Sequence, residues 1–469
     1  MSDGQSGRSV RLQVDSVVMK FGGTSVADAE AMTRVVNIVR KQWESQPKGS
    51  RPPVVVVSAL SKVTDGLLKV ADFARAGEGQ QAMELVLQLA ERHAGIARTL
   101  TSGRRADELV KTLQQDFGGL AGRIAIPAQT RIVTPANQDA IVAMGELASS
   151  RIVAAAFEEQ GLPSSWVDSR KVLVTDAEHT VAVPDMESTC RKAQQILAPL
   201  LRAEKIPVMG GFIAATIDEV TTTLGRGGSD YSAAIFGACL DVGEIQIWTD
   251  VDGMLTADPR VVPSPRVVPQ LSFAEASELA YFGAKVLHPA TILPAVSKNI
   301  PVRILNSRQP ANPGTLITAE ASRERHMAAL ACKREVTVID ITSTRMFMAH
   351  GFLRRLFEVF ERFKTAVDVV TTSEVSVSVT VDDTRKLKDI VDALREFSEV
   401  ECEPKMAIVS VVGDRLHDDP GVFARAIVAL DGIPLRLVSQ ASSRRTFTFV
   451  LDDSRAPEAM TKLHQAFFK

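Results

Sequence analysis

The segment TTTLGRGGSD at residues 221–230 decides the fold of this chain, because it joins a short β-branched run to a glycine-rich turn. An apolar, helix-forming stretch follows at 231–238, so the turn is predicted to lead directly into a helix. Its three glycines leave backbone N–H groups uncovered, and Ser229 and Asp230 are residue types expected at a helix N-cap. Such donors suit an anionic group, and the planar guanidinium of Arg226 suits a carboxylate or a phosphate.

A second glycine-containing turn lies near the start of the chain, where KFGGTS at 20–25 follows an apolar, strand-like run at 12–19. Backbone N–H donors beside the ammonium of Lys20 are what a transferring phosphoryl group requires. The chain has no Walker A pattern and no grouping of serine, cysteine and histidine typical of covalent catalysis. One glycine turn alone is more often an ordinary surface turn, but the two together favour direct transfer between two bound anions.

Length and composition place the chain among large globular proteins. Its 469 residues are too many for one ordinary domain, which predicts two or three domains. The hydrophobic share of 45% and the charged share of 23% are typical of a globular protein. A formal net charge of −2 and an aromatic share of 5% argue against a nucleic-acid-binding surface, so no nucleic-acid partner is predicted.

The four cysteines, Cys190, Cys239, Cys332 and Cys402, are far apart in the sequence. Because the chain also lacks CxxC and HxxxH pairs, this spacing predicts reduced thiols and no metal site. No run of eighteen apolar residues occurs, and the first sixteen residues carry no apolar signal-peptide core. These features predict a cytoplasmic protein without a membrane partner.

The order of apolar runs predicts an α/β domain. Residues 1–10 have the composition of a disordered extension, and the domain is predicted to span 11–320. Helical periodicity at 28–39 lies between two strand-like runs, and helix-forming residues dominate 66–160. This alternation predicts a mainly parallel central sheet sandwiched by helices. The further strand-like runs are 54–57, 165–174, 206–213, 245–248 and 302–305.

The C-terminal residues 328–469 have a different pattern, which contains an internal repeat. A strand, an amphipathic helix and two strands at 336–381 recur about seventy residues later at 407–450. Two βαββ units of this size predict an α+β domain in which two modules share an eight-stranded sheet. Such a pair of modules is either a dimerisation device or a small-molecule sensor.

Four segments carry a resemblance to a known family: 20–25, 221–230, WTD at 248–250 and FGAKVLHPA at 282–290. In this order and spacing they resemble the signature segments of aspartate kinases, in the amino-acid kinase superfamily. The resemblance covers essentially the whole chain, since the C-terminal repeat resembles the paired ACT domains of the same family.

The resemblance also implies how the repeat is divided. In the family, the first ACT unit is inserted after the first strand of the second, which would place ACT1 at about 334–402. ACT2 would then combine about 328–333 with 403–469. A homodimer formed through the ACT domains, or a higher oligomer, is also implied.

The reaction that the resemblance implies is the phosphorylation by ATP of the side-chain carboxylate of L-aspartate. The product, 4-phospho-L-aspartate, begins the pathway to lysine, threonine, methionine and isoleucine. Lys20 would stabilise the γ-phosphoryl charge and Asp230 would orient Lys20, so these two are the implied catalytic residues. Glu146 would hold the substrate α-ammonium, because a buried acid needs a cation, and Arg226 would clamp the α-carboxylate. The residues implied to bind the substrate are Ser58, Thr64, Glu146, Arg226 and Ser229.

A nucleotide site follows from the same resemblance. Magnesium would arrive with ATP and be held largely by phosphate oxygens and water, so no metal ligands are expected in the protein. The residues implied to bind ATP are Lys20, Gly22, Gly23, Thr24, Ser25, Gly227, Gly228, Thr249, Asp250, Arg260 and Lys285.

For the ACT domains, the resemblance implies feedback inhibition by an end product, with lysine favoured. Asp368 would pair with the ammonium of that amino acid. The alternative is a structural role for the same residues, most of which are apolar. The residues implied to bind the effector are Met346, Met348, Gly351, Phe352, Leu353, Val367, Asp368, Thr372, Ser373 and Glu374.

Two other functions stay open from the sequence. A kinase of another small acidic amino acid, such as glutamate, would need a different fit of Arg226 and Glu146 to a longer substrate. A non-catalytic amino-acid sensor would use the ACT domains alone. Such a sensor would be expected to have lost at least one of Lys20, Asp230 and Glu146, and all three are present.

Overall fold

The computed structural model describes residues 16–283, 289–321, 327–343, 350–440 and 444–468. The described residues fall into two compact units, which are treated separately below. The first contains the residues up to Gly253 together with 289–319, and the second contains 254–283 and the residues from 320 onward. The domain limits expected from the sequence, 11–320 and 328–469, stay a prediction.

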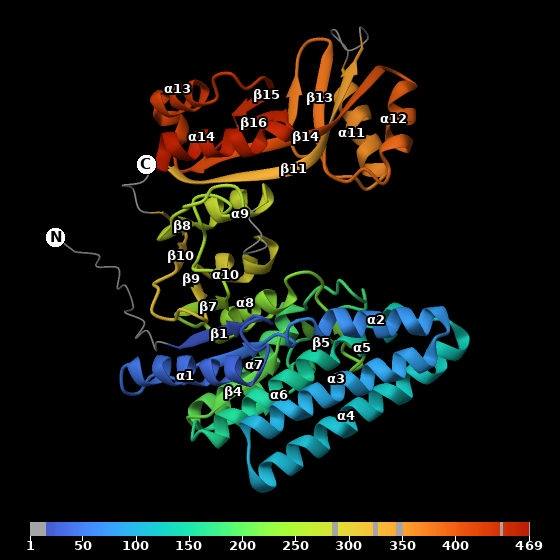
Figure 1. The fold of residues 1–469 in the computed structure, drawn as a ribbon, viewed down its shortest axis with the longest axis vertical. Helices are drawn as coiled ribbons and strands as arrows, with labels where there is room; N and C mark the ends of the chain where they lie inside the picture. The colour runs from blue at the N-terminus through green and yellow to red at the C-terminus, as the bar shows by residue number, and fades with distance from the viewer. Residues whose placement is uncertain (1–15, 284–288, 322–326, 344–349, 441–443, 469) are drawn as a thin grey trace, which may run out of the picture. The chain divides into compact units, whose positions relative to one another are not determined.

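A mainly parallel sheet forms the centre of the first unit, which confirms the predicted α/β class (Figure 1). Its strands are ordered β3-β4-β2-β1-β7-β9-β10, and the β9–β10 pair is antiparallel. Every residue of β1 and β2 is buried, as expected for parallel strands that are covered on both faces. The strands are β1 (Val17–Phe21), β2 (Val54–Val57), β3 (Ser164–Val167), β4 (Ile206–Gly210), β7 (Glu244–Thr249), β9 (Val302–Asn306) and β10 (Thr315–Thr318).

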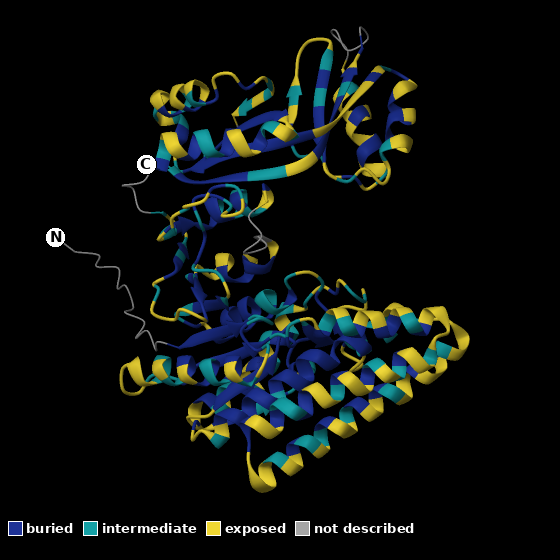
Figure 2. Cartoon of the chain, viewed as in Figure 1, coloured by how far each residue is buried: buried dark blue, intermediate teal, exposed yellow. Residues whose placement is uncertain are grey.

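Helices pack around this sheet, and the long helices α3 and α4 lie side by side (Figure 1). Both show a buried and an exposed stripe, as their amphipathic sequences predict (Figure 2). The helices are α1 (Ala29–Ser45), α2 (Val63–Ala76), α3 (Gly79–Leu100), α4 (Gly103–Thr130), α5 (Pro135–Val142), α6 (Met144–Glu159), α7 (Met186–Arg202), α8 (Gly228–Leu240) and α10 (Leu293–Lys298), with short 3-10 turns at Ser169–Lys171 and Pro289–Ile292.

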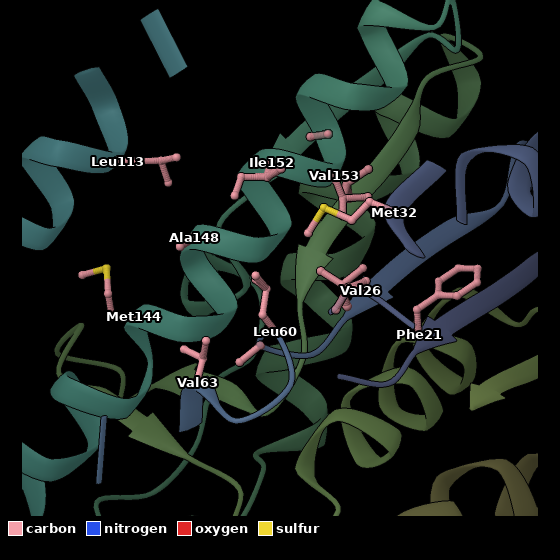
Figure 3. Packing of buried hydrophobic residues seen from close by; sticks show 14 of the residues in the cluster. Phe21, Val26, Met32, Leu60, Val63, Leu113, Met144, Ala148, Ile152 and Val153 are labelled. Carbon is pink, nitrogen blue, oxygen red and sulfur yellow. The ribbon is translucent and has the colours of Figure 1, made fainter. Parts of the chain in front are cut away.

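One hydrophobic cluster holds the helices against the sheet. It joins Phe21 of β1 to Met32 of α1, Leu113 of α4 and Ile152 of α6, all of them buried (Figure 3). Burying a side chain of this size contributes about 1.5–3 kcal/mol, so the cluster fixes the strand ends that carry the site. The stretch Pro135–Glu159 is long and apolar enough to cross a membrane, but 83% of its most apolar part is buried inside the unit.

Two strand predictions in this unit need correction. The run at 165–174 is a strand only up to Val167, because the Asp168 carboxylate accepts the Arg170 backbone N–H and starts a 3-10 turn. The run at 206–213 is broken after Gly210, where Phe212 adopts a positive φ of 66° and β5 (Ile213–Ala215) begins. β5 then pairs with β6 (Thr221–Thr223) as a separate antiparallel hairpin.

The prediction that all four cysteines are reduced thiols is wrong for one pair. Cys190 of α7 and Cys239 of α8 form a disulfide, with their Cα atoms 4.6 Å apart. The two helices pack against each other, which brings together residues 49 positions apart. Cys332 and Cys402 are free thiols.

The second unit contains one antiparallel sheet, ordered β12-β13-β11-β14-β16-β15. The predicted eight strands are therefore six, because β11 and β14 each run through both repeats. Leu330 pairs with Val411, which places the first part of β11 beside the second repeat, and Ile339 pairs with Cys402 farther along both strands. The strands are β11 (Met327–Thr342), β12 (Val370–Thr372), β13 (Ser376–Val381), β14 (Glu399–Gly413), β15 (Leu435–Gln440) and β16 (Thr446–Asp452).

Each half of this sheet has its own hydrophobic cluster. One is built on α11 and α12 with Ile339 and Val379, and the other on α13 and α14 with Val409 and Phe449. The helices of the unit are α9 (Phe273–Tyr281), which follows β8 (Gln270–Ser272), α11 (Phe352–Arg362), α12 (Leu387–Arg395), α13 (Pro420–Ala429) and α14 (Ala456–Phe468).

Candidate active site

The first glycine turn leaves β1 at the carboxyl edge of the sheet, where ligands bind in open α/β folds. The Gly22 backbone N–H donates to the carbonyl of Trp248 in β7 (3.0 Å), and the Ser25 N–H donates to the Gly22 carbonyl (2.9 Å). The Ser25 hydroxyl is buried and lies 2.7 Å from the hydroxyl of Ser307, just after β9. Ser25 therefore anchors the turn to neighbouring strands.

The second glycine turn follows β6 and opens α8 directly. Gly227, with φ of 72°, is the N-cap of α8, a conformation that residues with a Cβ adopt only with strain. The expectation that Ser229 and Asp230 cap the helix is wrong, because the N-cap is Gly227 and the helix begins at Gly228. Both lie in its first turn, where an acidic side chain is favoured by the helix dipole.

An ion pair joins the two turns. Lys20 Nζ lies 2.6 Å from Asp230 Oδ1, and the two side chains are only 11% and 14% exposed. Lys20 is on β1 and Asp230 on α8, so the pair fixes the ammonium at the edge of the sheet. A partly buried lysine held in this way is a fixed positive charge for an incoming phosphoryl group.

A cavity of about 370 Å³ opens beside this ion pair, and it is contained in the first unit. It brings together nine residues expected at the site from the sequence: Lys20, Gly23, Ser58, Thr64, Glu146, Gly227, Gly228, Ser229 and Asp230. They come from the ends of β1 and β2, the start of α2, the first turn of α6 and the first turn of α8. Ala59, Leu60, Ser61, Lys62, Asp65, Phe212 and Gly225 complete the wall.

Glu146 is the acid of the cavity whose pKa is shifted by its surroundings. Its side chain lies in the first turn of α6, is 3% exposed, and one carboxyl oxygen has no hydrogen-bond partner. Burial raises the pKa of Glu146 to about 8, although a hydrogen bond from the Ala59 backbone partly opposes the shift. A buried acid with an open oxygen toward a cavity is suited to a cationic ligand group.

Comparisons with known proteins agree with this geometry. The model of the amino acid kinase family matches residues 15–306, and that of an ACT domain matches 409–467. The chain is 34% identical to the lysine-sensitive aspartokinase 3 of Escherichia coli, over 97% of this chain and 99% of that one. The chain belongs to the aspartokinase family. A chloroplastic aspartokinase 3 of Arabidopsis thaliana is 33% identical over 96% of this chain and 81% of its own length.

A solved aspartokinase structure also resembles the fold. Escherichia coli aspartokinase III in complex with aspartate and ADP has a TM-score of 0.82 and 33% sequence identity. The match covers 97% of this chain and 100% of that one. The likeness extends over both the kinase and the ACT regions.

Other residues that the aspartokinase resemblance implied lie off the cavity wall. Thr249 is the last residue of β7 and Asp250 follows it, and the Thr249 carbonyl accepts the Ser307 N–H (2.8 Å). Arg226 is exposed. Arg260 is in the second unit, where its guanidinium pairs with Asp258 (2.6 Å). Gly22, Thr24 and Ser25 belong to the first turn, and Lys285 lies outside the described residues.

Two of the wall residues that were not predicted as site residues are Phe212 and Lys62. Phe212 adopts a left-handed backbone conformation, and its ring lies where a Cβ on Gly228 would fall, 2.6 Å from Cδ2. No local pattern reveals that contact. Lys62, with φ of 67°, stands at the start of α2 and adds a second ammonium to the wall. Lys62 lies between Ser58 and Thr64, which were both predicted to bind the substrate. A lysine in that position of the sequence could therefore have been predicted to line the site.

A protein-held metal site would need several ligating side chains close together. Within the described part of the chain, no group of three or more His, Cys, Asp or Glu side chains could hold a metal ion.

The implied effector residues lie in the second unit, and one of them already has a cationic partner. Asp368 has a side chain that is 2% exposed and lies 2.7 Å from Lys333 Nζ, which also approaches Asp382 (3.0 Å). The same ammonium lies 4.8 Å from the centre of the Tyr281 ring. The chain's own lysine thus occupies the position expected for an effector ammonium.

The other implied effector residues are spread along α11 and β12. Gly351 is the N-cap of α11, Phe352 is half-buried against Phe397, and Leu353 is exposed. The Val367 carbonyl accepts the Tyr281 hydroxyl (3.4 Å). Thr372, Ser373 and Glu374 are exposed at the end of β12, and Met346 and Met348 lie outside the described residues.

Proposed function

We propose that this chain transfers the γ-phosphoryl group of ATP to the side-chain carboxylate of L-aspartate, giving 4-phospho-L-aspartate and ADP. The observation that carries the proposal is the shared cavity, which combines the Lys20–Asp230 ion pair with the buried carboxyl of Glu146. The ammonium of the Lys20–Asp230 ion pair suits a phosphoryl group, and the carboxyl of Glu146 suits the ammonium of an amino acid. The relatives that support it are named aspartokinases, and that name describes the phosphorylation of aspartate.

In the proposed reaction, an oxygen of the substrate side-chain carboxylate attacks the γ-phosphorus. The new O–P bond forms as the bond to the β–γ bridging oxygen breaks, and that electron pair leaves with ADP. Lys20 stabilises the charge on the transferring group, and the N–H groups of Gly23 and Gly227 add dipoles. The N–H groups of Gly22 and Gly228 already donate to the carbonyls of Trp248 and Gly225. Asp230 holds the Lys20 ammonium in place without touching the phosphate, which an acid would repel.

We assign the substrate end of the cavity to Glu146 and its neighbours. Glu146 binds the α-ammonium, while Ser58, Thr64 and Ser229 supply hydroxyl groups from the same wall. Arg226 is proposed to bind the α-carboxylate, which requires its exposed side chain to turn toward the cavity when substrate binds.

The nucleotide end is proposed to continue from the glycine turns past β7. Thr24, Ser25, Thr249, Asp250, Arg260 and Lys285 are assigned to it on the family resemblance. Magnesium is proposed to enter with ATP, held largely by phosphate oxygens and water, and it would supply positive charge that neutralises the phosphates.

Regulation and assembly are also proposed on the family resemblance. Escherichia coli aspartokinase III has been solved with lysine and aspartate in a T-state, at a TM-score of 0.78 and 33% identity to this chain. We propose lysine as the feedback inhibitor, bound by the ACT residues around Asp368. We further propose a cytoplasmic homodimer that forms through the ACT domains.

ATP consumption with L-aspartate or L-glutamate, each with and without lysine or threonine, tests these assignments. Aspartate-dependent turnover that lysine suppresses is the expected result. Turnover with glutamate and not with aspartate would contradict the proposal and identify a kinase of another acidic amino acid. A protein that binds lysine but turns over neither acid would be a non-catalytic sensor, which contradicts the proposal.

A further inference from the structure

A buried acid outside the cavity connects the two halves of the substrate site. Asp139 lies on α5 and is fully buried, yet it is absent from the cavity wall. Its carboxylate accepts hydrogen bonds from three donors: His179 Nδ1–H at 2.8 Å, the Thr180 backbone N–H at 3.0 and 3.1 Å, and the Thr223 hydroxyl at 2.6 Å.

These donors come from separate parts of the first unit. His179 and Thr180 lie in the loop between β3 and α7, and Thr223 is the last residue of β6. A carboxylate removed from water is strongly disfavoured unless donors replace the lost hydration. Asp139 therefore ties α5, the loop and β6 together, and its bond to the Thr180 N–H helps to hold that residue at its strained φ of 72°.

The same contacts reach the glycine turn that opens α8. Thr223 immediately precedes the turn, and its carbonyl accepts the Ala182 N–H of the loop (2.9 Å). Gly225, with φ of 74°, lies so close to the loop that a Cβ there would be 3.2 Å from the Thr180 carbonyl oxygen. The loop that Asp139 holds is thus packed directly against the turn that carries Arg226.

Asp139 is also close in sequence to the other side of the substrate site. α5 ends at Val142, and α6 starts at Met144, two residues before Glu146. Asp139 therefore lies near both parts of the chain assigned to the amino-acid substrate, which are the turn that carries Arg226 and the helix that carries Glu146. Its bonds to Thr223 and Thr180 join α5 to the residues packed against the turn at 224–227.

We propose that Asp139 is a positioning residue of the substrate site, which acts through Thr223 and the 179–182 loop on the turn that carries Arg226. It does not touch the substrate. The inference rests on the proposed function, because it assumes that Arg226 and Glu146 bind an acidic amino acid. Loss of the Asp139 bonds would let the turn move relative to Glu146 and weaken binding of the amino acid more than binding of ATP.

Steady-state kinetics of four proteins test this inference, with KM measured separately for L-aspartate and for ATP. Asp139→Asn should raise the KM for aspartate by at least about tenfold, because the amide has one acceptor oxygen for three donors. The KM for ATP should change by less than about threefold. Thr223→Val, which removes one donor without changing shape, should raise the aspartate KM severalfold, and Thr223→Ser, which keeps the hydroxyl, should restore it.

Activity of the unaltered chain separates the two proposals. If that chain turns over no acidic amino acid, the proposed function fails before any variant is compared. If it turns over aspartate and folded Asp139→Asn has an aspartate KM within twofold of normal, the positioning role is wrong. Should Asp139→Asn fail to fold, equal aspartate KM values for Thr223→Val and Thr223→Ser would overturn the inference, and a difference between them would support it.

Discussion

Binding of aspartate to this chain should release a proton, because Glu146 is neutral in most molecules before the substrate arrives. With a pKa of about 8, only about one Glu146 carboxyl in eleven is ionised at pH 7. An ammonium in the cavity favours the ionised form, since an opposite charge at close range lowers the pKa of a carboxyl. We therefore expect release of about 0.9 proton per aspartate at pH 7 and about 0.5 at pH 8.

The same pKa sets the pH dependence of affinity. The ionised fraction of Glu146 rises from about 9% at pH 7 to about 50% at pH 8, so the association constant for aspartate should rise about fivefold. Calorimetric titration in buffers with different ionisation enthalpies measures the proton release directly. Glu146→Gln, which cannot ionise, should bind aspartate weakly and without proton release.

A second buried acid provides the matched control. Glu275 of α9 also has a pKa raised by burial, but it lies in the second unit and its carboxyl accepts from Ser272. Glu275→Gln should therefore leave the proton release unchanged. Aspartate binding without proton release at pH 7 in the unaltered chain would refute the assignment of Glu146 to the substrate ammonium.

Three further perturbations have defined outcomes. Lys20→Ala should lower kcat by about three orders of magnitude with an unchanged circular dichroism spectrum, and near-normal turnover would end the proposed phosphoryl-transfer mechanism. Burial lowers the pKa of His93 to about 4, so unfolded chains bind the extra proton first and stability falls as pH drops from 6.5 toward 4. Urea unfolding should show a loss of about 2 kcal/mol from this group between pH 7 and pH 5, and His93→Phe should lack that part of the loss. Lys333→Met should lower the lysine concentration for half-inhibition severalfold by freeing Asp368, whereas an unchanged or higher value would exclude Asp368 as the ammonium contact.

Much of the fold was predictable because its signals are local. Apolar four-residue strands such as 54–57 and the helix-forming composition of 66–160 are both local features of the sequence. The glycine turn before α8 was predictable for the same reason, since Gly225 and Gly227 have positive φ, which glycine adopts without strain. The predicted strand at 165–174 failed because a side-chain cap at Asp168 outcompeted the β pattern.

The candidate site was predicted as a set of residues, without their contacts. Nine expected residues meet at one cavity, since parallel strands bring their carboxyl ends to the same edge. Phe212 was missed because its role depends on an unusual backbone angle. The free state predicted for Cys190 and Cys239 was wrong because helix packing, which spacing along the chain does not reveal, placed them together.

By itself, the sequence determined the α/β class, the two glycine turns and the residue types that suit a phosphoryl group and an acidic amino acid. Only the tertiary structure decided that Lys20 meets Asp230, that Glu146 is buried enough to raise its pKa, and that Asp139 supports the turn beside them. The physical reason is the distance along the sequence over which each kind of interaction acts. Turns and periodicities arise from neighbouring residues, whereas ion pairing and desolvation depend on side chains that packing brings together from distant parts of the chain.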